Sequence, residues 1–168
     1  MKLIKLILWK LRRKIWGALV LRKVKKHENE IFIGGKTRLT KGVTLGKNPN
    51  FNGMTVSGYG EVVFGDNFHS GKECLIITSN HNYDYGEAIP YDKTDIKKKT
   101  VIGDNVWFGD RVIVLPGVCI GEGAIIQAGS VVSSNIPSYG IAGGNPARVF
   151  KYRDIDHYNN LKFLNRYH

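Results

Sequence analysis

Cysteine is scarce in this sequence, with 2 among 168 residues, and no Asn-x-Ser/Thr triplet occurs. Cys74 and Cys119 are too few to form the disulfide framework of a small secreted domain. No cluster of Cys and His has the spacing of metal ligands either. We therefore expect a protein of a reducing cytoplasm and no bound metal.

Acidic residues are absent from the first 26 positions. That stretch contains ten Lys and Arg, which account for nearly all of the formal net charge of +11. The remainder of the chain is close to neutral, so any acidic partner should contact this N-terminal segment. A nucleic-acid partner would need base-reading or aromatic residues in the body, and because we find no such pattern we expect none.

Long hydrophobic runs are missing as well, since no uncharged stretch approaches the roughly 20 residues of a membrane-spanning helix. Residues 1–26 instead predict a basic amphipathic helix, because apolar residues recur there at steps of three and four. The apolar face consists of Leu3, Ile4, Ile7, Leu8, Leu11, Ile15, Ala18 and Leu19. Such a helix suits an anionic membrane surface, with Trp9 and Trp16 at the headgroups, and the protein would then be peripheral at the cytoplasmic membrane. The alternative is that the stripe packs on its own domain or on a neighbouring subunit.

Glycine, in contrast, is abundant at 20 residues, and it accompanies a six-residue repeat. Apolar residues stand at Ile102, Phe108, Val114, Ile120, Ile126 and Val132, and a second series precedes each by two positions. A helix would scatter such residues around its surface. Short strands joined by Gly or Asn turns would point them all inward, and three hexapeptides would form one triangular coil. Stacked coils would then bury a continuous core.

The sequence therefore predicts an all-β solenoid over residues 27–152. An inserted loop at 79–99 breaks the repeat, and excursions from a regular solenoid are where function is usually found. Residues 153–168 predict a short helix that caps the open coil through Ile155, Leu161 and Leu164.

The chain resembles the hexapeptide-repeat acyltransferases over about residues 60–151, with weaker coils upstream, and it is most similar to the branch that O-acetylates galactosides, maltose and capsule or exopolysaccharides. The resemblance rests on four motifs in the family's order: Trp107-Phe108-Gly109, Leu115-Pro116-Gly117-Val118, Ala128-Gly129-Ser130 and Gly144-Asn145-Pro146-Ala147-Arg148. It implies a left-handed parallel β-helix, acetyl-CoA as co-substrate and a carbohydrate acceptor. It also implies a homotrimer with three active sites between subunits.

His81, near the start of the inserted loop, is the predicted general base. In the family a histidine 16 residues beyond a Gly-Asp-Asn turn deprotonates the acceptor, and the step from Gly65 to His81 matches that spacing. An alcohol is a poor nucleophile toward a thioester, and an imidazole can take its proton as the oxygen attacks. Asp84 and Glu61 are candidates for a carboxylate that orients the imidazole.

The resemblance also implies the donor site. The backbone N–H of Asp110, which follows Gly109, would stabilise the tetrahedral oxyanion if the Asp110 side chain points away. Contacts to coenzyme A would come from Trp107, Ala128 and Ser133, and from the basic residues Arg148 and Lys151 at its phosphates.

Acceptor contacts are expected from polar residues around His81. The candidates are Asn80, Asn82, Tyr83 and Asp84, with Asn52 from an upstream coil, while Tyr85 and Tyr91 are candidates to stack on a sugar ring.

Three other functions remain open at this point. N-acetylation of a free or nucleotide-linked amino sugar would use the same fold and donor, but it would depend less on His81 because a neutral amine needs less help from a base. A non-catalytic scaffold would not bind acetyl-CoA. A zinc hydro-lyase resembling the γ-type carbonic anhydrases would need three histidines at a subunit interface, yet only His69 and His81 lie in the coils.

Overall fold

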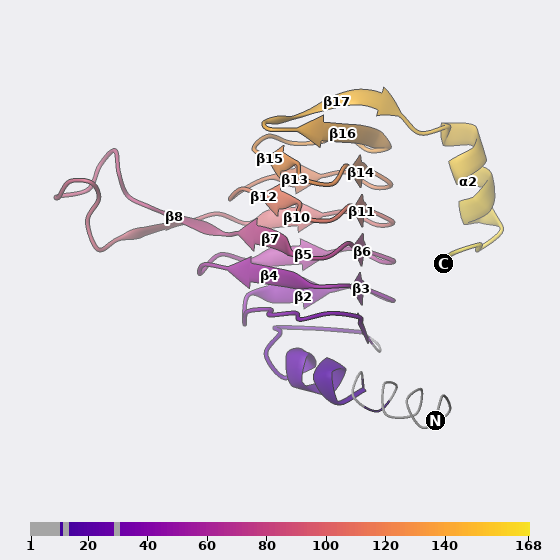
Figure 1. Cartoon of the computed structure of the whole chain (residues 1–168), viewed down its shortest axis with the longest axis horizontal. Helices are drawn as coiled ribbons and strands as arrows, with labels where there is room; N and C mark the ends of the chain where they lie inside the picture. Colours follow the sequence, from indigo (N-terminus) through magenta and orange to yellow (C-terminus); the bar gives the residue numbers. More distant parts are fainter. Residues whose placement is uncertain (1–10, 12–13, 29–30) are drawn as a thin grey trace.

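The computed structural model describes residues 11, 14–28 and 31–168, and its body is a stack of triangular coils (Figure 1). Parallel strands form three faces, here named A, B and C. Face A consists of β2 (Val43–Leu45), β5 (Val62–Phe64), β10 (Thr100–Ile102) and β13 (Cys119–Ile120). Face C consists of β4 (Met54–Ser57), β7 (Cys74–Ile77), β12 (Ile113–Val114) and β15 (Val131–Val132). The predicted β-solenoid of hexapeptide repeats is confirmed.

Face B is the longest sheet and also closes one end of the stack. Its parallel strands are β1 (Phe32–Ile33), β3 (Asn50–Phe51), β6 (His69–Ser70), β11 (Trp107–Phe108), β14 (Ile125–Ile126) and β16 (Gly140–Gly144). The chain then turns back as β17 (Ala147–Tyr152), which pairs antiparallel with β16. This antiparallel strand covers the last coil, where a further parallel strand would otherwise pair.

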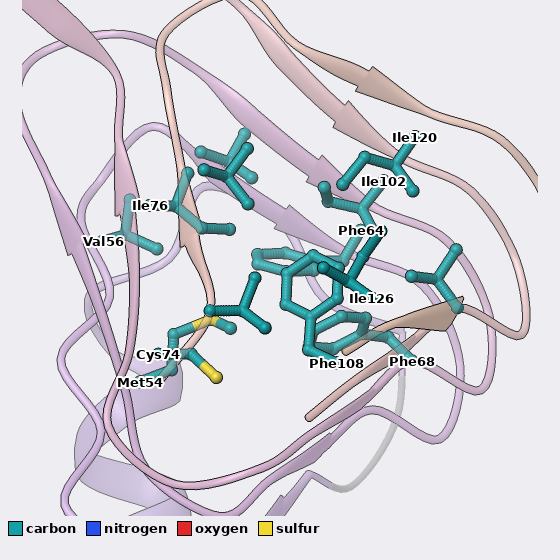
Figure 2. Close-up of a cluster of buried hydrophobic side chains, with 14 of the residues drawn as sticks. Met54, Val56, Phe64, Phe68, Cys74, Ile76, Ile102, Phe108, Ile120 and Ile126 are labelled. Atoms are coloured by element: carbon teal, nitrogen blue, oxygen red, sulfur yellow. The ribbon is translucent and has the colours of Figure 1, made fainter. Parts of the chain in front are cut away.

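The core consists of the side chains that the six-residue period points inward. The six residues of the main series are at most 2% exposed, and Phe64, Phe68 and Phe108 lie together at its centre (Figure 2). The ring centroids of Phe64 and Phe68 lie 4.7 Å apart, and Phe108 meets Phe68 edge-on at 5.1 Å. Each such side chain contributes about 1.5–3 kcal/mol by leaving water, so stacking of coils is the main source of stability.

A ladder of asparagines runs along the corner between faces A and B. Asn48, Asn67 and Asn105 adopt left-handed backbone conformations with φ of 52°, 54° and 56°. Asn48 Nδ2 donates to Asn67 Oδ1 at 3.1 Å, and Asn67 Nδ2 donates to Asn105 Oδ1 at 3.0 Å. Asparagine suits this corner because it tolerates the left-handed region and carries both a donor and an acceptor.

The C-terminal helix α2 (Ile155–Phe163) extends this ladder. Asn105 Nδ2 donates to the Tyr158 hydroxyl oxygen at 2.7 Å, and the Tyr158 hydroxyl donates to Glu122 Oε1 at 2.9 Å. The next coil has Gly123, with φ of 68°, where an asparagine would continue the series. A Cβ on Gly123 would lie 3.0 Å from the Tyr158 ring, so the missing side chain makes room for that ring.

Helix α2 therefore lies beside the coils and not over their end, which differs from the expected cap (Figure 1). Ile155 and Leu164, two of its expected contacts, are 43% and 47% exposed, whereas Tyr158 is 8% exposed. The physical reason is that β17 already closes the last coil, while the Asn105 and Glu122 side chains offer partners on the flank.

The N-terminal segment is helical over residues 14–21 and packs on the opposite end of the stack (Figure 1). Gly17 and Val20 are buried, while Leu11, Ile15 and Leu19 are 54%, 53% and 46% exposed. One side of the helix thus contacts its own domain, and an apolar stripe faces outward. Ala18, also in the predicted stripe, is exposed, whereas Leu3, Ile4, Ile7, Leu8 and Trp9 lie outside the described residues. No helix in the described part of the chain is both long enough and apolar enough to cross a membrane.

Candidate functional site

The inserted loop is a two-stranded ribbon, here called the arm, that leaves the stack at the corner between faces C and A. β8 (Ser79–His81) pairs antiparallel with β9 (Asp95–Lys97), and the pair projects away from the coils (Figure 1). At its base the buried Thr78 hydroxyl donates to the Ser57 carbonyl at 2.8 Å and accepts from the Gly60 N–H at 3.0 Å. A Cβ on Gly60 would lie 2.4 Å from the Thr78 carbonyl oxygen, so only glycine allows this close approach.

Local hydrogen bonds order the tip of the arm. The Asp92 carboxylate accepts from the Thr94 hydroxyl at 2.5 Å, the Thr94 N–H at 2.8 Å and the Glu87 N–H at 3.1 Å. These bonds lower the pKa of Asp92, those from Thr94 most strongly. Asn82 Oδ1 accepts from the Tyr85 N–H at 3.2 Å. The segment beyond β8 is therefore folded back on itself toward β9.

This fold places His81 beside Tyr91 and Asp95, two residues of the segment that leads back to the coils. The imidazole stacks on the Tyr91 ring with centroids 3.8 Å apart and planes 5° apart. His81 Nδ1 lies 3.5 Å from Asp95 Oδ1, and the two residues are directly opposite each other in the strand register. The His81 side chain is 53% exposed. It is therefore oriented on one side by a ring and a carboxylate while remaining open to a substrate.

The carboxylate beside His81 is neither of those expected from the sequence. Glu61 Oε1 instead bonds Lys25 Nζ at 2.5 Å, which lowers the pKa of Glu61. Asp84 is exposed, and the carboxylate nearest the His81 ring is that of Asp95. Tyr91, expected to stack on a sugar, stacks on His81. Asp95 was missed because its approach depends on the ribbon register, which no repeat in this segment reveals.

The expected acceptor-binding residues divide into two places. Asn80, Asn82, Tyr83 and Asp84 lie on the arm with His81, and Tyr83 is 64% exposed. Asn52 lies at the corner between faces B and C, where its Nδ2 donates to the Ser70 carbonyl at 2.9 Å. Its side chain supports the coil, and the structure does not bring it to His81 within one chain.

The expected donor-site residues are grouped on face B and at the corner between faces B and C. A Cβ on Gly109 would lie 2.6 Å from the Ala128 nitrogen, so these coils approach closely there. Asp110 Oδ1 accepts from the Lys72 N–H at 2.8 Å, so this carboxylate serves the neighbouring coil. No hydrogen bond joins the Asp110 N–H to another described residue. Trp107 points outward from β11 and is 53% exposed.

The remaining expected contacts to coenzyme A lie elsewhere on the coils. Ser133 directly follows β15 and is exposed. Arg148 and Lys151 lie on β17, and one Arg148 guanidinium nitrogen, Nη1, donates to the Ala147 carbonyl at 3.1 Å. Both cations are exposed at the closed end of the stack.

A single chain thus keeps His81 apart from Trp107 and Asp110. The arm connects face C to face A, and face B lies opposite that corner (Figure 1). Among the residues that the structure describes, no three His, Cys, Asp or Glu side chains are grouped as metal ligands.

Comparisons with known proteins agree with this architecture. Residues 99–134 match the model of the bacterial transferase hexapeptide (six repeats). A Lysinibacillus sphaericus protein described as a macrolide acetyltransferase is 35% identical over 122 residues, which cover 60% of this chain and 67% of that protein. The chain belongs to the hexapeptide-repeat acetyltransferase family. A Staphylococcus aureus (strain COL) protein described as an acetyltransferase is 56% identical over 55 residues, but these span only 28% of its length and 33% of this chain.

Solved structures of this family have the same fold. A maltose O-acetyltransferase from Clostridium difficile 630 superposes with a TM-score of 0.62 and 31% identity, covering 77% of this chain and 66% of that one. A galactoside acetyltransferase in complex with coenzyme A gives a TM-score of 0.61 and 27% identity, covering 80% of this chain and 63% of that one. The match therefore includes the coils and leaves about a third of each of those chains unmatched.

Proposed function

We propose that this hexapeptide-repeat protein transfers an acetyl group from acetyl-CoA to a hydroxyl of a carbohydrate, with His81 as the general base. The observation that carries the proposal is the exposed imidazole of His81, held between Tyr91 and Asp95 on the arm. Two similar structures are a maltose O-acetyltransferase and a galactoside acetyltransferase with coenzyme A, which supports both the donor and the acceptor class.

The mechanism follows from the side of His81 that faces Asp95. With Nδ1 beside the carboxylate, Nε2 is the nitrogen that takes the acceptor's proton as the hydroxyl oxygen attacks the thioester carbonyl. Asp95 stabilises the imidazolium that forms, and the Tyr91 ring restricts its rotation. Collapse of the tetrahedral intermediate breaks the carbon–sulfur bond, and the imidazolium returns the proton to the leaving thiolate. The products are an acetyl ester and coenzyme A.

The other half of the active site comes from a second copy in this proposal. His81 and face B lie on opposite sides of one stack, so Trp107 and the Asp110 N–H reach a given His81 only from a neighbouring chain. The Asp110 carboxylate accepts from the backbone N–H of Lys72, and the Asp110 N–H, which bonds no other described residue, is suited to donate to the oxyanion. We propose a homotrimer with three such interfaces, in which Ala128 and Ser133 line the pantetheine arm and Arg148 and Lys151 meet the phosphates.

Thiol release from acetyl-CoA, measured against a panel of sugars and amino sugars, tests this function. His81→Ala should lower kcat by about 10²–10⁴-fold, the usual contribution of a positioned base. His157→Ala is the matched control, because His157 is an exposed histidine on α2, and it should retain the wild-type rate.

Each alternative has a distinct result in the same assay. Acetylation of amino sugars alone, with a small effect of His81→Ala, would favour N-acetylation. If no acceptor causes thiol release and acetyl-CoA does not raise the unfolding temperature, the protein is a scaffold and the enzyme proposal is rejected. Wild-type turnover of a sugar by His81→Ala would remove the assigned base.

The outward stripe of the N-terminal helix further supports a peripheral position on the cytoplasmic face of a membrane. Leu11, Ile15 and Leu19 are about half exposed and lie near Lys14 and other cations. Such a helix gains apolar burial and attraction to anionic lipids together.

Sedimentation with vesicles tests the membrane contact. Ile15→Gln with Leu19→Gln should reduce binding to phosphatidylserine-containing vesicles, while Ile89→Gln, at a 98% exposed position on the arm, should leave it unchanged. Equal binding by both variants would reject the membrane contact and leave the enzyme proposal intact.

A further inference from the structure

A cavity of about 270 Å³ lies between face B and the C-terminal segment. Its floor includes the outward side chains of Trp107 on β11 and His69 on β6, which are opposite each other in the strand register. Its other wall comes from α2 and the residues after it, including Lys162, Arg166 and Tyr167. Figure 1 shows this helix standing beside the column of β6, β11 and β14.

The lining of this cavity is basic. Arg153, Lys162 and Arg166 contribute to it, and no Asp or Glu does. Two of these cations are engaged nearby: Lys162 Nζ bonds Glu122 Oε1 at 2.5 Å, and an Arg153 guanidinium nitrogen donates to the Gly123 carbonyl at 3.2 Å. The Arg166 side chain makes no ion pair or hydrogen bond with the part of the chain that is described. One guanidinium is therefore available for an anion.

The floor adds an aromatic surface and a neutral polar group. Trp107 is 53% exposed, so a flat apolar face is open to a ligand. Burial lowers the pKa of His69, and the charge of His168 lowers it further. The His69 imidazole is consequently uncharged at neutral pH and can accept or donate a hydrogen bond.

We propose that this cavity binds a phosphate ester, with Arg166 on the phosphate and Trp107 against the attached ring. A guanidinium offers phosphate a planar fork of donors, and an indole face suits a sugar ring. The volume is near the lower end of the ligand pockets of about 300–1,000 Å³ found in proteins. A volume of this order can enclose a monosaccharide phosphate but not a whole coenzyme A. This assignment rests on the proposed function and deepens it: the acceptor is a phosphorylated sugar.

Calorimetric titration of the full chain without acetyl-CoA tests the inference, with glucose 1-phosphate, glucose and inorganic phosphate as probes. Wild-type protein should bind glucose 1-phosphate more tightly than either glucose or phosphate. Arg166→Gln should weaken that binding by about tenfold or more, as expected for loss of a charge-assisted hydrogen bond. Arg38→Gln, at an exposed arginine that does not line the cavity, should not.

A second variant distinguishes the contribution of the ring contact to binding from that of the phosphate contact. Trp107→Leu should weaken glucose 1-phosphate binding and leave the binding of inorganic phosphate unchanged. Unfolding temperatures of all variants confirm that each one is folded. Equal effects of Arg166→Gln and Arg38→Gln, or equal affinity for glucose and its phosphate, would overturn the proposal.

The phosphate groups of the acetyl donor could also occupy this cavity. Titrations with coenzyme A and dephospho-coenzyme A test that alternative. If Arg166→Gln weakens coenzyme A binding but not glucose 1-phosphate binding, the cavity belongs to the donor and the acceptor assignment is wrong. The binding assay is also independent of turnover. Arg166-dependent binding of glucose 1-phosphate without acetyl transfer to any sugar would reject the proposed function alone.

Discussion

The coils and the arm of this chain are ordered by different kinds of interaction. In the coils, side chains at every sixth position are almost fully buried, and each strand pairs with its counterpart one turn away. In the arm, Tyr85 and Ile89 are 88% and 98% exposed, and order comes from one short ribbon and the bonds to Asp92. The coils supply stability through burial, whereas the arm positions His81 by a few specific contacts.

This difference indicates that stability and chemistry are carried by separate residues. A coil side chain contacts neighbours in the turns above and below, so its loss is transmitted through the stack. An arm side chain has few such neighbours, so its loss should affect the imidazole and little else. Substitutions in the two regions should therefore have effects of different kinds.

The largest effect should follow truncation in the coil core. Phe108 is 0% exposed and meets Phe68 edge-on, so Phe108→Ala should lower the free energy of unfolding by about 3–5 kcal/mol. Tyr85→Ala, at an aromatic residue of the arm, should change it by no more than about 0.5 kcal/mol. Urea unfolding followed by circular dichroism measures both. A similar loss for the two variants would remove the distinction between the regions.

A smaller effect, on catalysis alone, should follow a change beside His81. Asp95→Asn keeps the shape of the side chain but removes the charge that lies 3.5 Å from Nδ1. We expect kcat to fall by about 10–100-fold, because the imidazolium loses its stabilising partner, with KM and the free energy of unfolding unchanged. Glu87→Gln, an equivalent change at another exposed carboxylate of the arm, should retain activity. A change in KM alone would mean that Asp95 contacts the acceptor and does not position His81.

The same contrast explains what the sequence could reveal. Each inward side chain of the coils repeats a constraint that its neighbour also obeys, so Ile102 to Val132 predicted both the fold and the buried set, and both are confirmed. The position of His81 on the insertion was also accessible, because it is counted from the Gly-Asp-Asn turn of a regular coil. Asp95 and Tyr91 were not accessible, since they meet His81 only through the antiparallel register of a ribbon that occurs once.

The placement of α2 was hidden for a related reason. The sequence predicted contacts through Ile155, Leu161 and Leu164, but Ile155 and Leu164 are exposed and the buried residue of the helix is Tyr158, which bonds Asn105 on the flank. The signal was present as an irregularity, because Gly123 replaces the asparagine that the two earlier Gly-Asp-Asn turns contain. A gap in a repeated ladder marks the place where something outside the repeat can bind.

The smallest of these effects should follow removal of the hydroxyl that completes this ladder. Burial and the hydrogen bond to Glu122 raise the pKa of Tyr158, so its hydroxyl stays protonated and donates at neutral pH. Tyr158→Phe removes the hydroxyl that accepts from Asn105 and donates to Glu122, while Lys162 still bonds the Glu122 carboxylate. We expect a loss of about 1 kcal/mol in the docking of α2 and faster tryptic cleavage after Lys162 and Arg166. Tyr152→Phe, at a tyrosine of β17 that is 52% exposed, should cleave at the wild-type rate. Unfolding of the coils should be the same in both variants, and a joint loss of coil stability would show that the helix and the stack fold as one unit.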